Sequence, residues 1–426
     1  MNTLSKSNFG FIGKLFLTVF TAFVLLVFFA PEKHHTLGFE NIDEIMSDAA
    51  GKDEFVKPDK FEDYTWPLWH GYWPKIHKGF FGRRLDNAFE TLGIKKRPAW
   101  SASYFRYLFE KVTRERKEEG YRLEHVVRLV PSDNARFIIF GDLHGSYHSL
   151  VRSLQRLVEL GVINKDLTLA RPDDHIVFMG DAINRSAFVM ETLTIMAKLA
   201  DKNHDRVWHL GGNAEHTSSY EQYIIDPIGS LPFLPWEKRG ERLTNVVEKY
   251  LWTLPLGIYL SVPPHNTDAF VRISHFERYN FTHIKYKRFV DLLNPDYYSD
   301  ALLEGREADK RKVIYLDERT QSRSKKLIDI KGLINSVTKM WVYDKKSRGL
   351  QRLISDGNAA TWTAMSCPSA QLHTTLLDFH YDAFVVLQVA SRFDDWTITR
   401  HSRDIKSDEK FQTTTYDFMW GRELIK

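Results

Sequence analysis

Between residues 135 and 212 the chain alternates short apolar runs with amphipathic stretches, and this alternation is the strongest constraint on the fold. The apolar runs are ARFIIF, HIVFMG and RVWHLGG, which begin at Ala135, His175 and Arg206. Each run is short enough for a buried strand, and the stretches between them have apolar residues at helical spacing. This order predicts an α/β fold whose site lies at the carboxyl edge of a sheet.

The first amphipathic stretch, YHSLVRSLQRLVEL, predicts a helix with one apolar face. Leu150, Leu154, Leu157 and Val158 fall on that face, and Gly161 follows as a stop signal. The stretch AFVMETLTIMAKLA after the second apolar run predicts a second helix. A third helix is expected earlier in the chain, over residues 103–119.

Polar residues of ligand type follow the predicted strands. Asp142 and His144 come after the first apolar run, Asp181 after the second and Asn213 after the third, while His275 follows a later run, FVRIS. Carboxylate, imidazole and amide groups suit divalent metals such as Mn²⁺, Fe²⁺ or Zn²⁺. A Gly-Asp pair alone can also start a turn, and a single strand-end histidine can be a core residue. The metal interpretation therefore rests on the whole set.

Composition excludes several other classes of protein. The 426 residues carry a formal net charge of only +4, with no basic stripe interleaved with aromatics, so we expect no nucleic-acid partner. Cys367 is the single cysteine, which rules out a disulfide framework within the chain. The length suits one large domain with extensions, or two domains.

The amino-terminal region predicts membrane attachment. An uncharged apolar run spans Leu15–Ala30, with Lys6 and Lys14 before it. We expect residues 1–35 to form a single-pass anchor with the amino end in the cytoplasm and the main domain outside it, in the periplasm if the source is bacterial. A cleaved signal peptide is the alternative, although Pro31 makes a poor cleavage junction, and a buried helix is a further one.

The remaining chain divides into three segments. Residues 36–125 form an aromatic-rich and helical extension, which is either a packing arm or a lip near a site. Residues 126–400 form the main domain, in which strands dominate after residue 250 and the charged segment 299–327 is expected to be loop and helix. Residues 401–426 are expected to be a C-terminal tail.

Taken in order, the motifs resemble those of a known family. GDLHG, GDAINR, GGNAE, LPLGIYL, FVRISH and ATWTAMSCPS resemble the calcineurin-like metallophosphoesterases, and more narrowly the phosphoprotein phosphatases, over about residues 131–395. The narrower family has GDxHG, GDxVDRG, GNHE, a leucine–proline strand, HGG, a late histidine and SAPNY. The resemblance implies a four-layer α/β/β/α sandwich of two mixed sheets, here preceded by the anchor.

The resemblance also implies a metal-ligand set and a substrate. Asp142 and His144 would bind one divalent ion, Asp181 would bridge two, and Asn213 and His275 would bind the second. The ions would be two of Mn, Fe or Zn, and the substrate a phosphorylated molecule, in the narrower family a protein.

Two further residues take their roles from the same motifs. Arg185 matches the arginine that grips the phosphate through its planar fork of donors, and Asn213 would also contact the substrate. The late metal-binding histidine falls on Tyr343, which would either bind the second metal as a phenolate or simply pack.

The chain departs from the family at the general acid. The usual aspartate–histidine pair is replaced by Asn184 and Ala214, while Glu215 remains. His216, two residues beyond the lost histidine, is a candidate replacement acid or else a surface or packing residue. The HGG glycines are Phe276 and Glu277, and SAPNY reads SCPSA.

The motifs and their departures leave three functional hypotheses to be tested. The first is a metal-dependent phosphatase that uses metal-activated water and an altered general acid. The second is a pseudophosphatase that binds without turnover, because both halves of one acid pair are lost together. The third is a phosphodiesterase or nucleotide hydrolase on the same fold, against which the narrower motifs argue.

Overall fold

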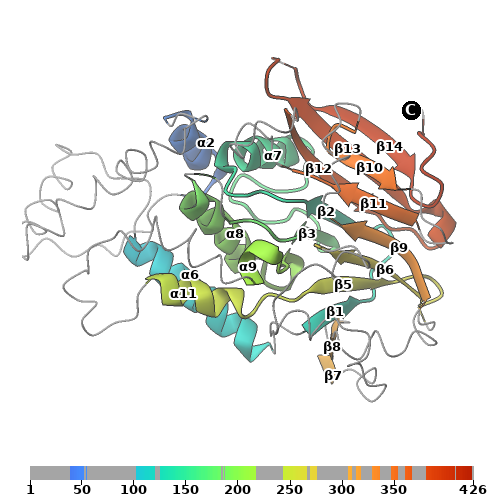
Figure 1. The fold of residues 1–426 in the computed structure, drawn as a ribbon, viewed down its shortest axis with the longest axis horizontal. Coiled ribbons are helices and arrows are strands. Elements are labelled where there is room, and N and C mark those ends of the chain that lie inside the picture. The colour runs from blue at the N-terminus through green and yellow to red at the C-terminus, as the bar shows by residue number, and fades with distance from the viewer. Residues whose placement is uncertain are drawn as a thin grey trace, which may run out of the picture.

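The strands of the protein form two mixed sheets that face each other (Figure 1). The structure, a computed structural model, describes residues 39–51, 54, 102–119, 125–183, 186, 188–216, 243–265, 269–275, 306–308, 313–317, 329–335, 347–353, 360–366, 380–407 and 409–424.

The six-stranded sheet has the order β14-β13-β12-β2-β3-β4. Its strands are β2 (Arg136–Phe140), β3 (Asp174–Phe178), β4 (Val207–His209), β12 (Tyr381–Gln388), β13 (Thr397–Asp404) and β14 (Gln412–Asp417). β2, β3 and β4 run parallel, so their carboxyl ends lie at one edge, as the strand–helix alternation predicts.

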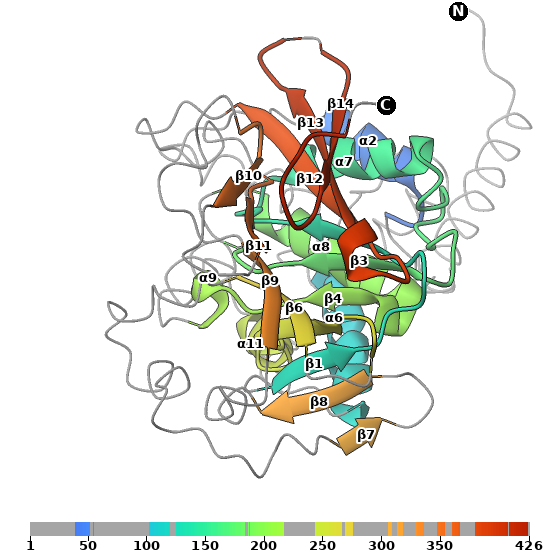
Figure 2. The same cartoon turned by 90° about the vertical axis from the view of Figure 1, so that its right-hand side faces the viewer.

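The eight-stranded sheet has the order β10-β11-β9-β6-β5-β1-β8-β7. Its strands are β1 (His125–Leu129), β5 (Gly257–Ser261), β6 (Ala269–Ser274), β7 (Arg306–Ala308), β8 (Val313–Asp317), β9 (Asp329–Asn335), β10 (Leu350–Leu353) and β11 (Ala360–Ala364). β6, β9 and β11 are parallel to one another. Figure 2 shows β1, β8 and β7 together at one end of the molecule.

Helices cover the outer face of the six-stranded sheet. They are α2 (Ile42–Ala50), α6 (Ala102–Glu118), α7 (Tyr147–Glu159), α8 (Val189–Asn203), the short α9 (Asn213–His216) and α11 (Leu243–Leu251). Their apolar side chains form one buried cluster with Ile138, Phe140 and Phe178 of the sheet. Two 3₁₀ turns, His204–Arg206 and Phe393–Asp395, complete the described elements.

The second core lies between the two sheets. Alternate residues of β2, Phe137 and Ile139, belong to this second cluster together with Ile258 of β5 and Trp362 of β11. β2 is therefore buried on both faces, which explains its continuous apolar run.

The predicted α7 face agrees with the structure. Leu150, Leu154 and Leu157 are fully buried, Val158 packs against the same core, and Gly161 takes a positive φ of 62° just beyond the helix. The prediction of two mixed sheets with helices is confirmed. The described helices pack on the six-stranded sheet, and the described residues place no helix on the outer face of the eight-stranded sheet.

Two segments differ from expectation. Residues 299–327, expected as loop and helix, contain β7 and β8, and β8 pairs with β1. Val313–Asp317 contains two β-branched residues and a tyrosine, which favour a strand despite the charges around them. Residues 401–426, expected as a tail, complete β13 and form β14, whose threonines pair with β13.

The amino-terminal predictions are only partly visible. Residues 1–35 lie outside the described residues, and within the described part no helix is both long and apolar enough to cross a membrane. In the extension, α6 forms where a helix was predicted. α2, which lies against α7 in both views (Figures 1 and 2), was not foreseen. Both helices bury apolar side chains in the core, as a packing arm would.

Candidate metal centre

Four of the predicted ligand side chains meet at the carboxyl edges of the two sheets. Asp142 and His144 follow β2, Asp181 follows β3, and His275 directly follows β6 of the other sheet. Their side chains are nearly inaccessible, with residue exposures between 1% and 5%. The site is therefore assembled from both sheets and shielded from solvent.

His144 is oriented toward the two carboxylates. Its Nδ1 lies 3.2 Å from the carbonyl oxygen of Ile183. Because a carbonyl oxygen only accepts hydrogen bonds, Nδ1 is the donor, and in the neutral ring Nε2 then has the lone pair. Nε2 lies 3.6 Å from Asp142 Oδ2 and 3.8 Å from Asp181 Oδ2.

These three side chains form a donor set that fits a divalent cation. One ligand atom from each of Asp142, His144 and Asp181 lies within 4.8 Å of the other two. Three lone-pair donors this close, two of them anionic and buried, need a positive charge between them. Carboxylate oxygen and imidazole nitrogen suit Mn²⁺, Fe²⁺ or Zn²⁺.

His275 lies between the same two carboxylates. Its Nδ1 is 3.6 Å from Asp142 Oδ1, and its Nε2 is 3.6 Å from Asp181 Oδ1. The ring reaches this position from the eight-stranded sheet, so the site depends on how the sheets face each other.

The loops that carry the ligands are joined through their backbones. The carbonyl oxygen of Asp181 accepts the N–H of His144 at 2.7 Å, and the carbonyl of Ala182 accepts the N–H of Gly145 at 2.7 Å. His144 and Asp181 have φ values of 46° and 49°, a left-handed conformation that non-glycine residues rarely adopt. Such strain concentrates at functional sites.

The eight-stranded sheet contributes a second anchor for the Asp142 loop. Asp142 pairs with Met365 in an isolated parallel bridge, and Gly141 donates its N–H to Ser366 Oγ at 2.9 Å. A side chain at Gly141 would place its Cβ 2.3 Å from the carbonyl oxygen of Ala364, so only glycine allows this approach. Ser366 opens the SCPSA motif, whose position in the motif order was the available signal for this role.

The other predicted site residues are not placed by the described part of the chain. Arg185 and Tyr343 lie outside it. Asn213 and His216 begin and end α9, so their backbones are described, but their side chains are not.

Sequence reasoning gave no role to Glu215, which is buried beside the site. Its carboxylate accepts hydrogen bonds from the backbones of Asp181, Ala182 and Gly212. Burial, together with the charge of Asp181, raises the pKa of Glu215 to about 7. The signal in the sequence was an acid retained within an otherwise altered GNHE motif.

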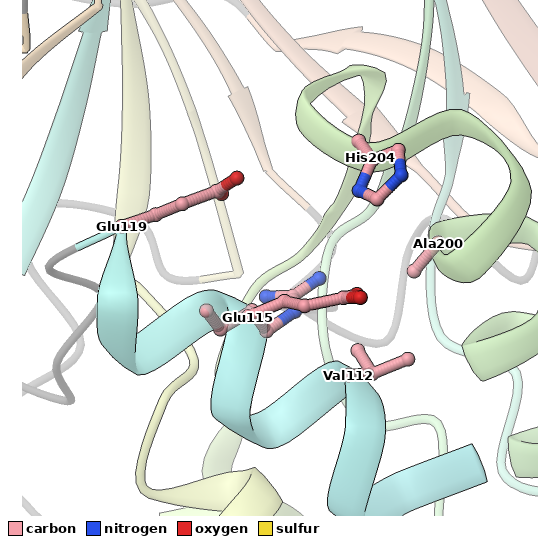
Figure 3. A pocket seen from close by; sticks show the side chains of 6 residues that line it. Val112, Glu115, Glu119, Ala200 and His204 are labelled. Carbon is pink, nitrogen blue, oxygen red and sulfur yellow. The ribbon is translucent and has the colours of Figure 1, made fainter.

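A separate pocket lies between α6 and α8 (Figure 3). Its lining residues are Val112, Glu115, Arg116, Glu119, Ala200 and His204. Arg116 donates to the carbonyl of Val207 at 3.4 Å and lies 5.4 Å from the centre of the Tyr250 ring. These contacts connect α6 to β4 and α11, so we assign this pocket to helix packing.

The comparisons with known proteins agree with a phosphoesterase fold. The sequence profile of the calcineurin-like phosphoesterase family matches residues 135–324, the segment that contains Asp142, His144, Asp181 and His275. The matched segment also contains the three buried side chains that could hold a metal ion, Asp142, His144 and Asp181. Residues 135–324 of this chain are therefore similar to the calcineurin-like phosphoesterases.

Several solved structures are similar at low scores. A protein serine/threonine phosphatase from Saccharomyces cerevisiae, described as similar to human phosphatase PP5, has a TM-score of 0.44 and 16% identity over 73% of this chain and 93% of that one. A cold-active protein-tyrosine phosphatase from Shewanella has a TM-score of 0.36 and 14% identity, over 66% of this chain and 81% of that one. Vps29 from Chaetomium thermophilum has a TM-score of 0.30 and 11% identity, over 67% of this chain and 99% of that one. Similarity at these scores does not establish a shared function.

Proposed function

We propose that the protein is a metal-dependent phosphoric monoester hydrolase that acts on phosphorylated protein. The observation that carries this proposal is the buried group of Asp142, His144 and Asp181, with His275 3.6 Å from both carboxylates. Two divalent ions bound there, of Mn, Fe or Zn, would supply an activated water and neutralise charge on the phosphoryl oxygens. The protein substrate rests on the narrower motif resemblance.

The chain's own residues divide the work of this site. Asp142 and His144 would hold one ion, Asp181 both, and Asn213 and His275 the second. In the same proposal Tyr343 would complete the second ion's ligands, while Arg185 and Asn213 would bind the phosphate oxygens.

The general acid is the altered part of the proposal. Ala214 occupies the position of the family's histidine, and its N–H donates to Asp181 Oδ1 at 2.7 Å. His216 is the candidate replacement. Loss of a general acid costs about 10²–10⁴-fold in rate, and the loss matters least for substrates with good leaving groups such as phenols.

The same substitution favours a second candidate function. With Asn184 and Ala214 in place of the acid pair, the site could bind a phosphorylated partner without turnover. A pseudophosphatase would retain metal binding and phosphate recognition but not hydrolysis.

Hydrolysis of p-nitrophenyl phosphate by the purified full-length chain with Mn²⁺ tests the proposal. We expect turnover that is lost in Asp142→Asn, and little turnover of bis-p-nitrophenyl phosphate. Turnover favouring the diester would point to a phosphodiesterase. Metal binding without hydrolysis of either ester, in folded protein, would favour the pseudophosphatase.

We also propose that residues 1–35 anchor the protein in a membrane, with the amino end in the cytoplasm and the phosphoesterase domain outside it. The support is the apolar run Leu15–Ala30 behind Lys6 and Lys14. In a bacterium this arrangement would place the site in the periplasm.

A further inference from the structure

Three backbone amides from two different loops converge on the carboxylate of Glu215. Asp181 and Gly212 donate their N–H groups to Oε2 at 2.8 Å and 2.9 Å, and Ala182 donates to Oε1 at 2.8 Å. Glu215 is 2% exposed. The carboxylate thus joins the loop after β3 to the loop after β4, beside the predicted metal ligands.

The two loops approach so closely that neither Gly180 nor Gly212 has room for a side chain. A Cβ at Gly180 would lie 2.4 Å from the backbone nitrogen of Gly212, and a Cβ at Gly212 would lie 2.4 Å from that of Asp181. Without the Glu215 acceptor, three N–H groups in this contact would be buried without a partner. Each such group costs about 1–3 kcal/mol.

Residues 214 and 215 hold both the backbone and the side chain of Asp181 through hydrogen bonds. Its N–H donates to Glu215, and its Oδ1 accepts the N–H of Ala214 at 2.7 Å. Its backbone has the uncommon φ of 49°. The direction of the Asp181 carboxylate therefore depends on residues 214 and 215.

The hydrogen bonds of Glu215 do not suit a general acid. Both carboxylate oxygens accept backbone N–H groups, and such hydrogen bonds favour the charged form of the group, which has no proton to donate. The residue acts through the backbone that carries Asp181.

We propose that Glu215 is a positioning residue of the metal centre, which fixes the left-handed backbone of Asp181 and so directs that carboxylate at the metal. This inference rests on the proposed metal-dependent function. Partners of metal ligands typically change metal affinity by about 10- to 100-fold when they are removed. The retained glutamate of the altered GNHE motif thus serves metal binding, independently of the lost acid.

Mn²⁺ affinity of the metal-free full-length chain, measured by calorimetry and by the electron paramagnetic resonance of free Mn²⁺, tests the inference. Glu215→Gln keeps the volume but turns an NH₂ group toward a backbone N–H. We expect it to bind Mn²⁺ about 10- to 100-fold more weakly than wild type. Glu159→Gln, a change at an exposed glutamate on α7, is the control and should keep wild-type affinity.

The outcomes separate a positioning role from a merely structural one. A loss of Mn²⁺ affinity with an unchanged near-ultraviolet circular dichroism spectrum supports positioning. Wild-type affinity in folded Glu215→Gln overturns the inference while leaving the proposed function intact. If Glu215→Gln does not fold, Glu215→Asp replaces it, and wild-type affinity in that variant overturns the inference equally. No Mn²⁺ binding by the wild-type chain overturns the proposed function, and the inference with it.

Discussion

At the scale of single residues, the buried acids of the metal centre carry a cost in stability. Asp142 is 5% exposed and Asp181 is 3% exposed, and both face the lone pair of His144 Nε2. Burying two carboxylates together is unfavourable unless a cation compensates them. Stability and metal binding are therefore opposed at this site, as they often are at functional sites.

Asp142→Asn should separate these two effects. Removing one buried charge reduces the repulsion between the two carboxylates in the metal-free protein. The melting temperature of the metal-free variant should therefore equal or exceed that of wild type. Saturating Mn²⁺ should stabilise wild type, by about 2.7 kcal/mol at 100 times the dissociation constant, but should leave the variant almost unchanged. Thermal unfolding with and without Mn²⁺ measures both. An equal Mn²⁺ gain in the two proteins would show that Asp142 is not a ligand.

His401 should make stability depend on pH. The ring stacks on Phe384 with centroids 4.8 Å apart. Burial, with a smaller contribution from the charge of Arg156, lowers the pKa of His401 to about 4. In the unfolded chain histidine titrates near pH 6.5. Between these pH values the unfolded chain binds a proton that the folded chain does not, so stability falls as the pH falls.

The change His401→Gln removes this titration. From pH 6.5 to pH 4 the free energy of unfolding should fall less in the variant than in wild type, by about 3 kcal/mol. Urea titrations at several pH values measure the difference. Parallel pH profiles for the two proteins would contradict the prediction.

At the scale of elements, hydrogen bonds and ion pairs join the amino-terminal extension to α7, the helix that follows Asp142 and His144. Tyr147, the first residue of α7, donates its hydroxyl to Asp48 Oδ2 at 2.7 Å, and His148 Nε2 lies 3.1 Å from the carbonyl oxygen of Ala49. Arg152, one turn further, pairs with Glu54 and with Asp382 of β12. These contacts join the extension, α7 and the six-stranded sheet.

Arg152→Ala should be strongly destabilising. The change leaves the fully buried carboxylate of Asp382 without its cation, and breaking a buried pair in this way costs about 3–5 kcal/mol. Arg156→Ala on the same helix is the matched control, because the partner that the described residues give Arg156 is the half-exposed Glu159. Its cost should be about 0.5 kcal/mol. Chemical denaturation measures the free energy of unfolding of both variants. Similar losses in the two would argue against a stabilising role for the Arg152 ion pairs.

At the scale of the whole molecule, the proposed anchor decides where the site works. The full-length chain should remain in the membrane fraction after extraction with sodium carbonate, while residues 36–426 alone should be soluble, because the removed segment carries the run Leu15–Ala30. Fractionation and immunoblotting measure this. A mature protein whose mass lacks the apolar run would instead establish a cleaved signal peptide.

The sequence by itself determined the parts of the protein that depend on local pattern. Hydrophobic periodicity reports burial over a few residues, so β2, β3 and β4 and the helix α7 could be predicted. The positions of Asp142 and Asp181 at the ends of parallel strands followed from the same pattern. β8 was missed because the charged residues around it obscured a short strand-favouring run, and its partner β1 lies far away in the sequence.

Only the tertiary structure decided how distant segments meet. His275 reaches Asp142 because two sheets face each other, and Met365 pairs with Asp142 across more than 200 residues of chain. No local periodicity encodes such contacts, because they depend on pairing and packing between segments far apart in sequence. The role of Glu215 is of the same kind. Its three amide donors come from loops that are brought together by the order of the strands.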